Sequence, residues 1–187
     1  MPYDRDEIVR LTLEYGGGWG LNHARRLLGL IEKIGQGRAY DSEALWLAAY
    51  LHDWGAYPAW VHKDVDHCLR SRQVAEPFLA ERGIPEHQRA LILECIEFHH
   101  APGADRGLEV VLLRDADALD FLGVVGVLRN FAINPRDLRK GFEETKRRRD
   151  RSLAILSLPE SQTLAAERIP HMDAFLARFE AETLGDF

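Results

Sequence analysis

Hydrophobic residues recur at spacings of three and four along most of the chain, the pattern of helices with one apolar face. No segment shows the sustained alternation of apolar and polar residues that a half-buried strand requires. Glycine and proline interrupt the helical pattern and mark where each element should end. The chain is therefore predicted to be all-α, with helices at residues 4–15, 20–35, 42–54, 64–82, 85–100, 107–131, 135–157 and 160–184.

The 187 residues contain no internal repeat, low-complexity segment or linker rich in proline and serine. This length suits one domain and can bury a sizeable core without disulfides. A single helical domain over residues 1–187, with a metal site between core helices, is therefore expected. Assembly as a homodimer stays open.

The composition limits which partners the protein can bind and in which cellular compartment it is expected. With 46% hydrophobic and 29% charged residues, the chain is typical of a folded soluble protein. Its net charge of −6 disfavours a nucleic acid polymer as partner, and no apolar stretch is long enough to cross a membrane. The N-terminal segment lacks the features of a signal peptide, and Cys68 and Cys95 indicate no disulfide framework. We expect a cytoplasmic protein in which both cysteines are buried apolar residues.

Three ionisable side chains lie on the apolar faces of predicted helices. His23 shares a face with Leu27 and Leu30, His52 extends the face of Leu45 and Ala48, and Asp53 follows His52 directly. Asp117 shares a face with apolar residues on both sides: Val110, Leu113, Phe121 and Val124.

An unpaired buried carboxylate costs several kcal/mol or more, so a polar group on such a face needs an explanation. A single histidine on an apolar face is more often a hydrogen-bonded core residue, and periodicity cannot show that three helices meet. The simplest joint explanation is that the groups converge on a cation. Their mixed nitrogen and oxygen ligands suit Mn, Fe, Ni, Co or Zn better than calcium.

Several segments resemble the HD superfamily of metal-dependent phosphohydrolases, and its small bacterial hydrolase branch in particular. The segment AAYLHDWG at residues 48–55 looks like the His-Asp signature, and NHARRLL at 22–28 looks like the opening histidine element. The Asp-Ala-Asp segment of that branch is matched by LRDADALDFLGVVGVLRNF at 113–131. Residues 152–182 are similar to its closing helices, so the resemblance covers nearly the whole chain in the expected order.

The resemblance implies metal ligands at His23, His52, Asp53 and Asp117. It favours Asp117 over Asp115 because the family's ligand is the second aspartate of the Asp-Ala-Asp segment. Asp115 and Asp120 would then be supporting groups beside the ligands. The chain departs from the family pattern at two places. No acidic residue follows the His-Asp pair until Asp64, and Ala118 stands where an arginine is common.

Further histidines suggest additional chemistry. His67 lies on the helix after the His-Asp pair, and His99 and His100 end the next helix. We interpret these three residues as substrate-binding groups, or as ligands of a second metal, because two-metal members of the superfamily place extra histidines in these regions. The alternative is that they are polar residues at a helix end, where histidine is favourable. His62, His87 and His171 are interpreted as surface residues.

The function predicted from these features is a phosphohydrolase acting on a small phosphorylated metabolite, most plausibly a nucleotide. The metal would activate water, and Mn, Fe, Co or Ni is expected in preference to Mg. Asp53 is the candidate proton acceptor. Arg26, Lys63 and Arg114 are the candidates for stabilising negative charge in the transition state.

Two other functions stay open at the level of sequence. A di-iron oxygenase of the same superfamily would take its missing ligands from His67 and His99. A non-catalytic sensor or interaction module would keep the fold and account for the absent acidic residue after His52–Asp53.

Overall fold

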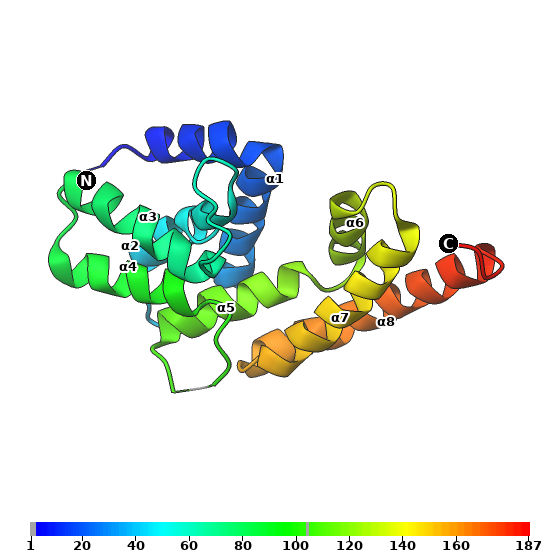
Figure 1. Cartoon of the computed structure of the whole chain (residues 1–187). Coiled ribbons are helices and arrows are strands. Elements are labelled where there is room, and N and C mark those ends of the chain that lie inside the picture. Colours follow the sequence, from blue (N-terminus) through cyan, green and yellow to red (C-terminus); the bar gives the residue numbers. More distant parts are fainter. Residues whose placement is uncertain (1–2, 104) are drawn as a thin grey trace. The chain divides into compact units, whose positions relative to one another are not determined.

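The computed structural model describes residues 3–103 and 105–187, and these residues form helices without a strand (Figure 1). The prediction of an all-α protein is therefore confirmed. No helix within these ranges is long and apolar enough to span a membrane. The elements are α1 (Arg5–Ile34), α2 (Ser42–Leu51), the 3-10 helix η1 (Trp54–Ala56), α3 (His67–Glu81), α4 (Glu86–Phe98), α5 (Leu108–Asp120), α6 (Val124–Ile133), α7 (Leu138–Ile155) and α8 (Pro159–Glu182).

The chain divides into two compact units, Met1–Ala116 and Asp117–Phe187, called here the first and second units. The division falls inside α5, so the first unit holds α1 to α4 and the first turns of α5. Within this unit α2 packs on α1 and α4, and α3 packs on α4 and η1. Every residue of α5 from Val110 to Asp120 is buried, which is typical of a core helix covered on all sides.

Side-chain caps start the two helices that lead into the His-Asp segment and away from it. The carboxylate of Asp41 accepts hydrogen bonds from the backbone N–H groups of Glu43 and Ala44, at 3.0 and 2.9 Å, and starts α2. The carboxylate of Asp66 accepts one from the N–H of Cys68 at 2.9 Å and starts α3. Each cap satisfies donors that have no partner within their own helix.

The predicted break at residues 16–20 appears as a kink inside α1. Gly17 has φ +62° and ψ −168°, a conformation that favours glycine, and helical hydrogen bonding resumes beyond it. The neighbouring glycines leave room for Tyr57, since a Cβ at Gly16 or Gly20 would overlap its ring. The kinked segment thus holds the loop that follows η1.

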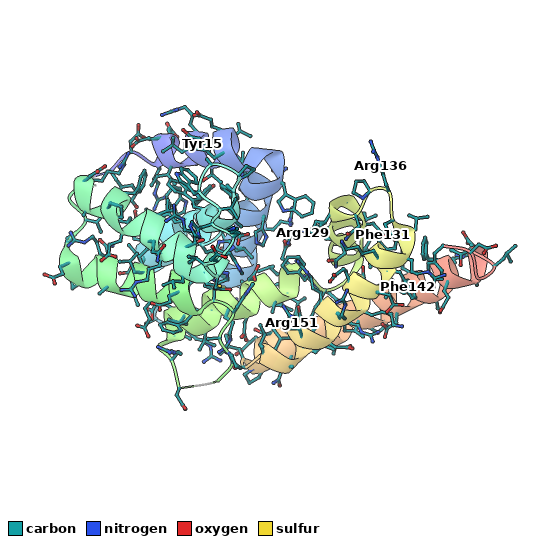
Figure 2. All side chains as sticks on the ribbon, in the orientation of Figure 1. Tyr15, Arg129, Phe131, Arg136, Phe142 and Arg151 are labelled. Atoms are coloured by element: carbon teal, nitrogen blue, oxygen red, sulfur yellow. The ribbon has the colours of Figure 1, made fainter. Side chains whose placement is uncertain are left out.

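Aromatic contacts also hold the loop that follows η1 against α1. Trp60 stacks on Trp54 with ring centroids 4.8 Å apart and contacts Tyr15 of α1 at 4.5 Å (Figure 2, which labels Tyr15). Trp54 is fully buried and its indole N–H donates to the Thr12 hydroxyl at 3.3 Å. These contacts pack both tryptophans against α1.

The helix predicted over residues 107–131 is wrong in its extent, because it is two helices. α5 ends at Asp120 and α6 begins at Val124. Gly123 between them has φ +81°, which a continuous right-handed helix cannot accommodate. The apolar spacing continues across the break, so periodicity alone predicted one element. The helix predicted over 42–54 likewise ends earlier, at Leu51, and η1 follows.

The second unit packs α6 against α7 and α8. Phe131 of α6 and Phe142 of α7, labelled in Figure 2, each contact Phe179 of α8, with centroids 5.0 and 5.9 Å apart. Asp120 and Arg129 form a buried ion pair at 2.5 Å. An aromatic cluster and a buried ion pair therefore both stabilise this unit.

We expect Gly20→Ala to destabilise the protein, because the added methyl would overlap the buried Tyr57 side chain. Overpacking of this kind costs about 1–3 kcal/mol. Gly29→Ala is the matched control: Gly29 lies on the same helix with no atom near its Cβ position, and alanine there should gain up to about 1 kcal/mol. Urea denaturation of both variants measures the difference. Equal midpoints would contradict the proposed fit between α1 and Tyr57.

Candidate metal centre

Three buried side chains from three helices meet in the interior. They are His23 of α1, His52 at the end of α2, and Asp117 of α5, with exposed fractions of 1%, 2% and 3%. One potential ligand atom from each lies within 4.8 Å of the other two. Asp117 is the first residue past the division between the units, on the helix whose earlier turns belong to the first unit.

Asp53 joins this group from the turn after α2. Its Oδ2 atom lies 3.7 Å from Nε2 of His23 and 3.5 Å from Nε2 of His52. The Asp53 backbone, with φ −102° and ψ 3°, has left the helix, and its side chain does not cap η1. The carboxylate therefore faces the two imidazoles. All four residues predicted as ligands are thus brought to one place.

The hydrogen bonding of His52 suits a metal ligand. Its Nδ1 lies 3.0 Å from the carbonyl oxygen of Ala49, which can only accept a hydrogen bond. Nδ1 is therefore the nitrogen that donates to this carbonyl, and Nε2, on the side of Asp53, is the ring nitrogen that could bind a metal. Backbone carbonyls commonly orient metal-binding imidazoles in this way. The donor set, two imidazoles and two carboxylates, fits a divalent transition metal.

The three basic residues predicted to stabilise the transition state differ in how deeply they are buried. Arg26 is half-buried on α1, one turn after His23, and Lys63 is exposed in the segment between η1 and α3. Arg114 is fully buried, and its guanidinium donates hydrogen bonds to the carbonyl oxygens of Ala101 and Gly103 and to Asp115. These acceptors give Arg114 a role in holding the turn after α4.

The two aspartates next to Asp117 also have arginine partners. Asp115 lies 3.3 Å from the guanidinium of Arg114, and Asp120 lies 2.5 Å from that of Arg129. Both pairs are buried. They support α5 and the start of the second unit.

A row of imidazoles extends from the candidate centre. The ring centroids of His23 and His52 are 5.1 Å apart, and those of His52 and His99 are 4.9 Å apart. His99 can form a second ligand group with His52 and Asp53. His67 and His100 lie beyond it, at 5.5 and 4.3 Å from the His99 ring.

Cys68 is the residue that sequence reasoning missed. It is buried as predicted and, like Cys95, forms no disulfide, and its sulfur lies among His67, His99 and His100. The signal was present as two adjacent pairs of ligand residues, 67–68 and 99–100, on consecutive helices. The three histidines interpreted as surface residues, His62, His87 and His171, are exposed.

Tyr57 lies close enough to the centre to respond to it electrostatically. Burial, and secondarily the negative charge of Asp53, raises the pKa of its phenol well above the usual value. The hydroxyl group therefore stays protonated over the physiological pH range and can act as a hydrogen-bond donor.

The chain belongs to the HD domain family, whose sequence model matches residues 20–122, more than half of the chain. The match includes all four residues of the candidate centre. A search of curated proteins found no match.

Solved structures show the same fold over nearly the full length. Bacillus subtilis YpgQ in complex with ADP is 22% identical with a TM-score of 0.70, and the alignment covers 96% of this chain and 97% of that one. A predicted HD superfamily hydrolase from an uncultured Thermotogales bacterium is 23% identical with a TM-score of 0.65, over 94% and 89%. An HD-superfamily hydrolase from Bacillus thuringiensis is 17% identical with a TM-score of 0.70, over 95% of each chain.

We expect Asp117→Asn to lower Mn²⁺ affinity by more than about tenfold, because it removes an anionic ligand from the buried centre. Isothermal titration and the Mn²⁺-induced rise in melting temperature both measure this loss. Asp115→Asn is the matched control, since the amide oxygen still accepts from Arg114 and the residue lies outside the ligand group. Loss of Mn²⁺ binding in the control, with full binding in Asp117→Asn, would reverse the assignment.

Proposed function

We propose that this protein is a metal-dependent phosphohydrolase that acts on a small phosphorylated metabolite, with a nucleotide as the favoured class. The observation that carries the proposal is the buried group of His23, His52 and Asp117, with ligand atoms within 4.8 Å of one another, and Asp53 beside it. Burying this many ionisable side chains is costly unless a cation balances them.

The four residues would hold a divalent ion such as Mn, Fe, Co or Ni. When bound, such an ion lowers the pKa of a coordinated water and polarises a phosphoryl oxygen, which is the chemistry that phosphate ester hydrolysis requires. Two neutral imidazoles and two carboxylates balance the charge of a divalent ion. Magnesium prefers an oxygen-rich shell and gives up its water reluctantly, so these ligands suit it less well.

Other residues of the chain would position the substrate and handle protons. Asp53, half-exposed compared with the buried histidines, is the group placed to accept a proton from the attacking water. Arg26 and Lys63 are the better candidates for contacting the phosphate, because Arg114 donates to backbone carbonyls and Asp115. His99 and His100 follow on from the centre and would contact the rest of the substrate.

A nucleotide is favoured by one relative of the same fold. The structure of Bacillus subtilis YpgQ is described as a complex with ADP. At 22% identity this likeness concerns the fold, so it supports the substrate class without transferring the activity.

The test is a screen of chelator-treated, metal-reloaded protein against nucleoside phosphates and sugar phosphates, with phosphate or pyrophosphate release as the readout. We expect hydrolysis of at least one nucleotide, restored by Mn, Co or Ni better than by Mg. His52→Ala should lower kcat by more than about a hundredfold, because it removes a ligand from the centre.

His87→Ala is the control, since His87 is an exposed histidine outside the centre, and it should keep wild-type activity. Full activity with Mg alone, or activity unchanged in His52→Ala, would contradict the assigned centre. A protein that hydrolyses no compound in the screen would instead support the non-catalytic sensor.

The group formed by His52, Asp53 and His99 favours a di-iron oxygenase as the second candidate. Asp53 lies near the first centre and also belongs to this group, so it would contribute to both sets of ligands if two irons were bound. Iron content and oxygen consumption of protein purified without chelators separate the two functions. The oxygenase predicts at least about one iron per chain and oxygen uptake; iron well below that level excludes it.

A further inference from the structure

We propose that the Cys68 thiolate is a ligand in the second metal site expected at His67, His99 and His100, and that it makes this site select a thiophilic divalent ion such as Zn²⁺. One ligand atom from each residue lies within 4.8 Å of the other three. The site is separate from the group of His23, His52 and Asp117, and its assignment does not depend on the reaction proposed above.

The distances around the sulfur match those between ligands of one ion. Sγ of Cys68 lies 3.5 Å from Nε2 of His67 and 3.8 Å from Nε2 of His99. In a tetrahedral zinc site, bond lengths of about 2.0–2.3 Å place neighbouring ligand atoms about 3.3–3.8 Å apart. The side chains therefore need little movement to share an ion.

The other nitrogen of each of these rings faces an oxygen atom of a neighbouring residue. Nδ1 of His99 lies 2.6 Å from the carbonyl oxygen of Ile96, and Nδ1 of His67 lies 3.7 Å from Oδ2 of Asp66. Both arrangements keep Nε2 on the side of the sulfur. Carbonyl and carboxylate groups commonly fix metal-binding imidazoles in this way. Asp66 also caps α3 through the N–H of Cys68, so one carboxylate orients two members of the group.

Helix packing brings the four residues together. His67 and Cys68 open α3, His99 and His100 follow α4, and these two helices pack against each other. Cys68 lies in the first turn of α3, where the positive end of the helix dipole favours a negatively charged ligand.

The ligand types give the two sites different metal preferences. A thiolate with imidazoles selects zinc or cobalt over manganese and magnesium, whereas the first centre offers only imidazoles and carboxylates. His99 also belongs to the group with His52 and Asp53, so the two sites adjoin. The thiol argues for zinc rather than a second iron at this position.

Titration of the purified, metal-free full-length chain with Co²⁺ tests the proposal. A cobalt–thiolate bond produces a charge-transfer absorption in the near ultraviolet, which sites without sulfur lack. We expect this band in the wild-type protein, its loss in Cys68→Ala, and its retention in Cys95→Ala, the matched removal of the other buried thiol. A band absent from the wild type, or unchanged in Cys68→Ala, would overturn the proposal and leave a thiol that only contacts imidazoles.

Two further variants extend the test. One distinguishes the loss of a ligand from misfolding, and the other distinguishes this site from the first centre. His100 is exposed, so His100→Ala should preserve the fold, checked by circular dichroism, and weaken Co²⁺ binding by more than about tenfold. Asp117→Asn disables the first centre and should keep the cobalt–thiolate band. If His100→Ala binds Co²⁺ with unchanged affinity, His100 is not a ligand of this site. Loss of the band in folded Asp117→Asn would show that no independent site exists. None of these measurements requires a substrate.

Discussion

The burial of ionisable groups is the constraint on which the rest of the structure depends. His23, His52 and Asp117 are almost fully removed from solvent, in a core built mostly from apolar side chains. Each would be costly alone, since a buried charge or unsatisfied imidazole loses its hydration. The cost falls when the groups face one another and a cation. The helices that carry them must then be held in fixed relation, and the kink of α1 at Gly17 with the packing of Tyr57 contributes to this.

The same cost explains how much of the centre could be predicted from the sequence. A histidine or aspartate on an apolar helix face is an exception to the burial pattern, and His23, His52 and Asp117 were visible for that reason. Asp53 has no such signal, because it lies in a turn, and its prediction came from its place beside His52 and from the family resemblance. Helical periodicity also predicted the all-α class, since one-sided burial imposes that spacing.

The features that could not be predicted depend on backbone geometry or on contacts between distant segments. Gly123 ends α5 although the apolar spacing continues, because the backbone turn is independent of which side chains are buried. The guanidinium of Arg114 donates to two backbone carbonyls and to Asp115, and the carbonyl acceptors leave no pattern in the sequence. Cys68 looked like an ordinary buried cysteine, and the packing of α3 on α4 is what brings its sulfur beside the two histidines that follow α4.

The two groups of ligands also differ in charge, and the difference bears on the substrate. Two carboxylates in the first centre would neutralise a divalent ion, whereas one thiolate and three imidazoles would leave a net positive charge at the second. The chain as a whole carries −6 and would repel a phosphorylated molecule at long range. On these proposals the second ion supplies local attraction, and His100, its exposed ligand, marks the solvent side from which an anion would approach. The missing acidic residue after His52–Asp53 fits this arrangement, because an added carboxylate there would reduce the attraction.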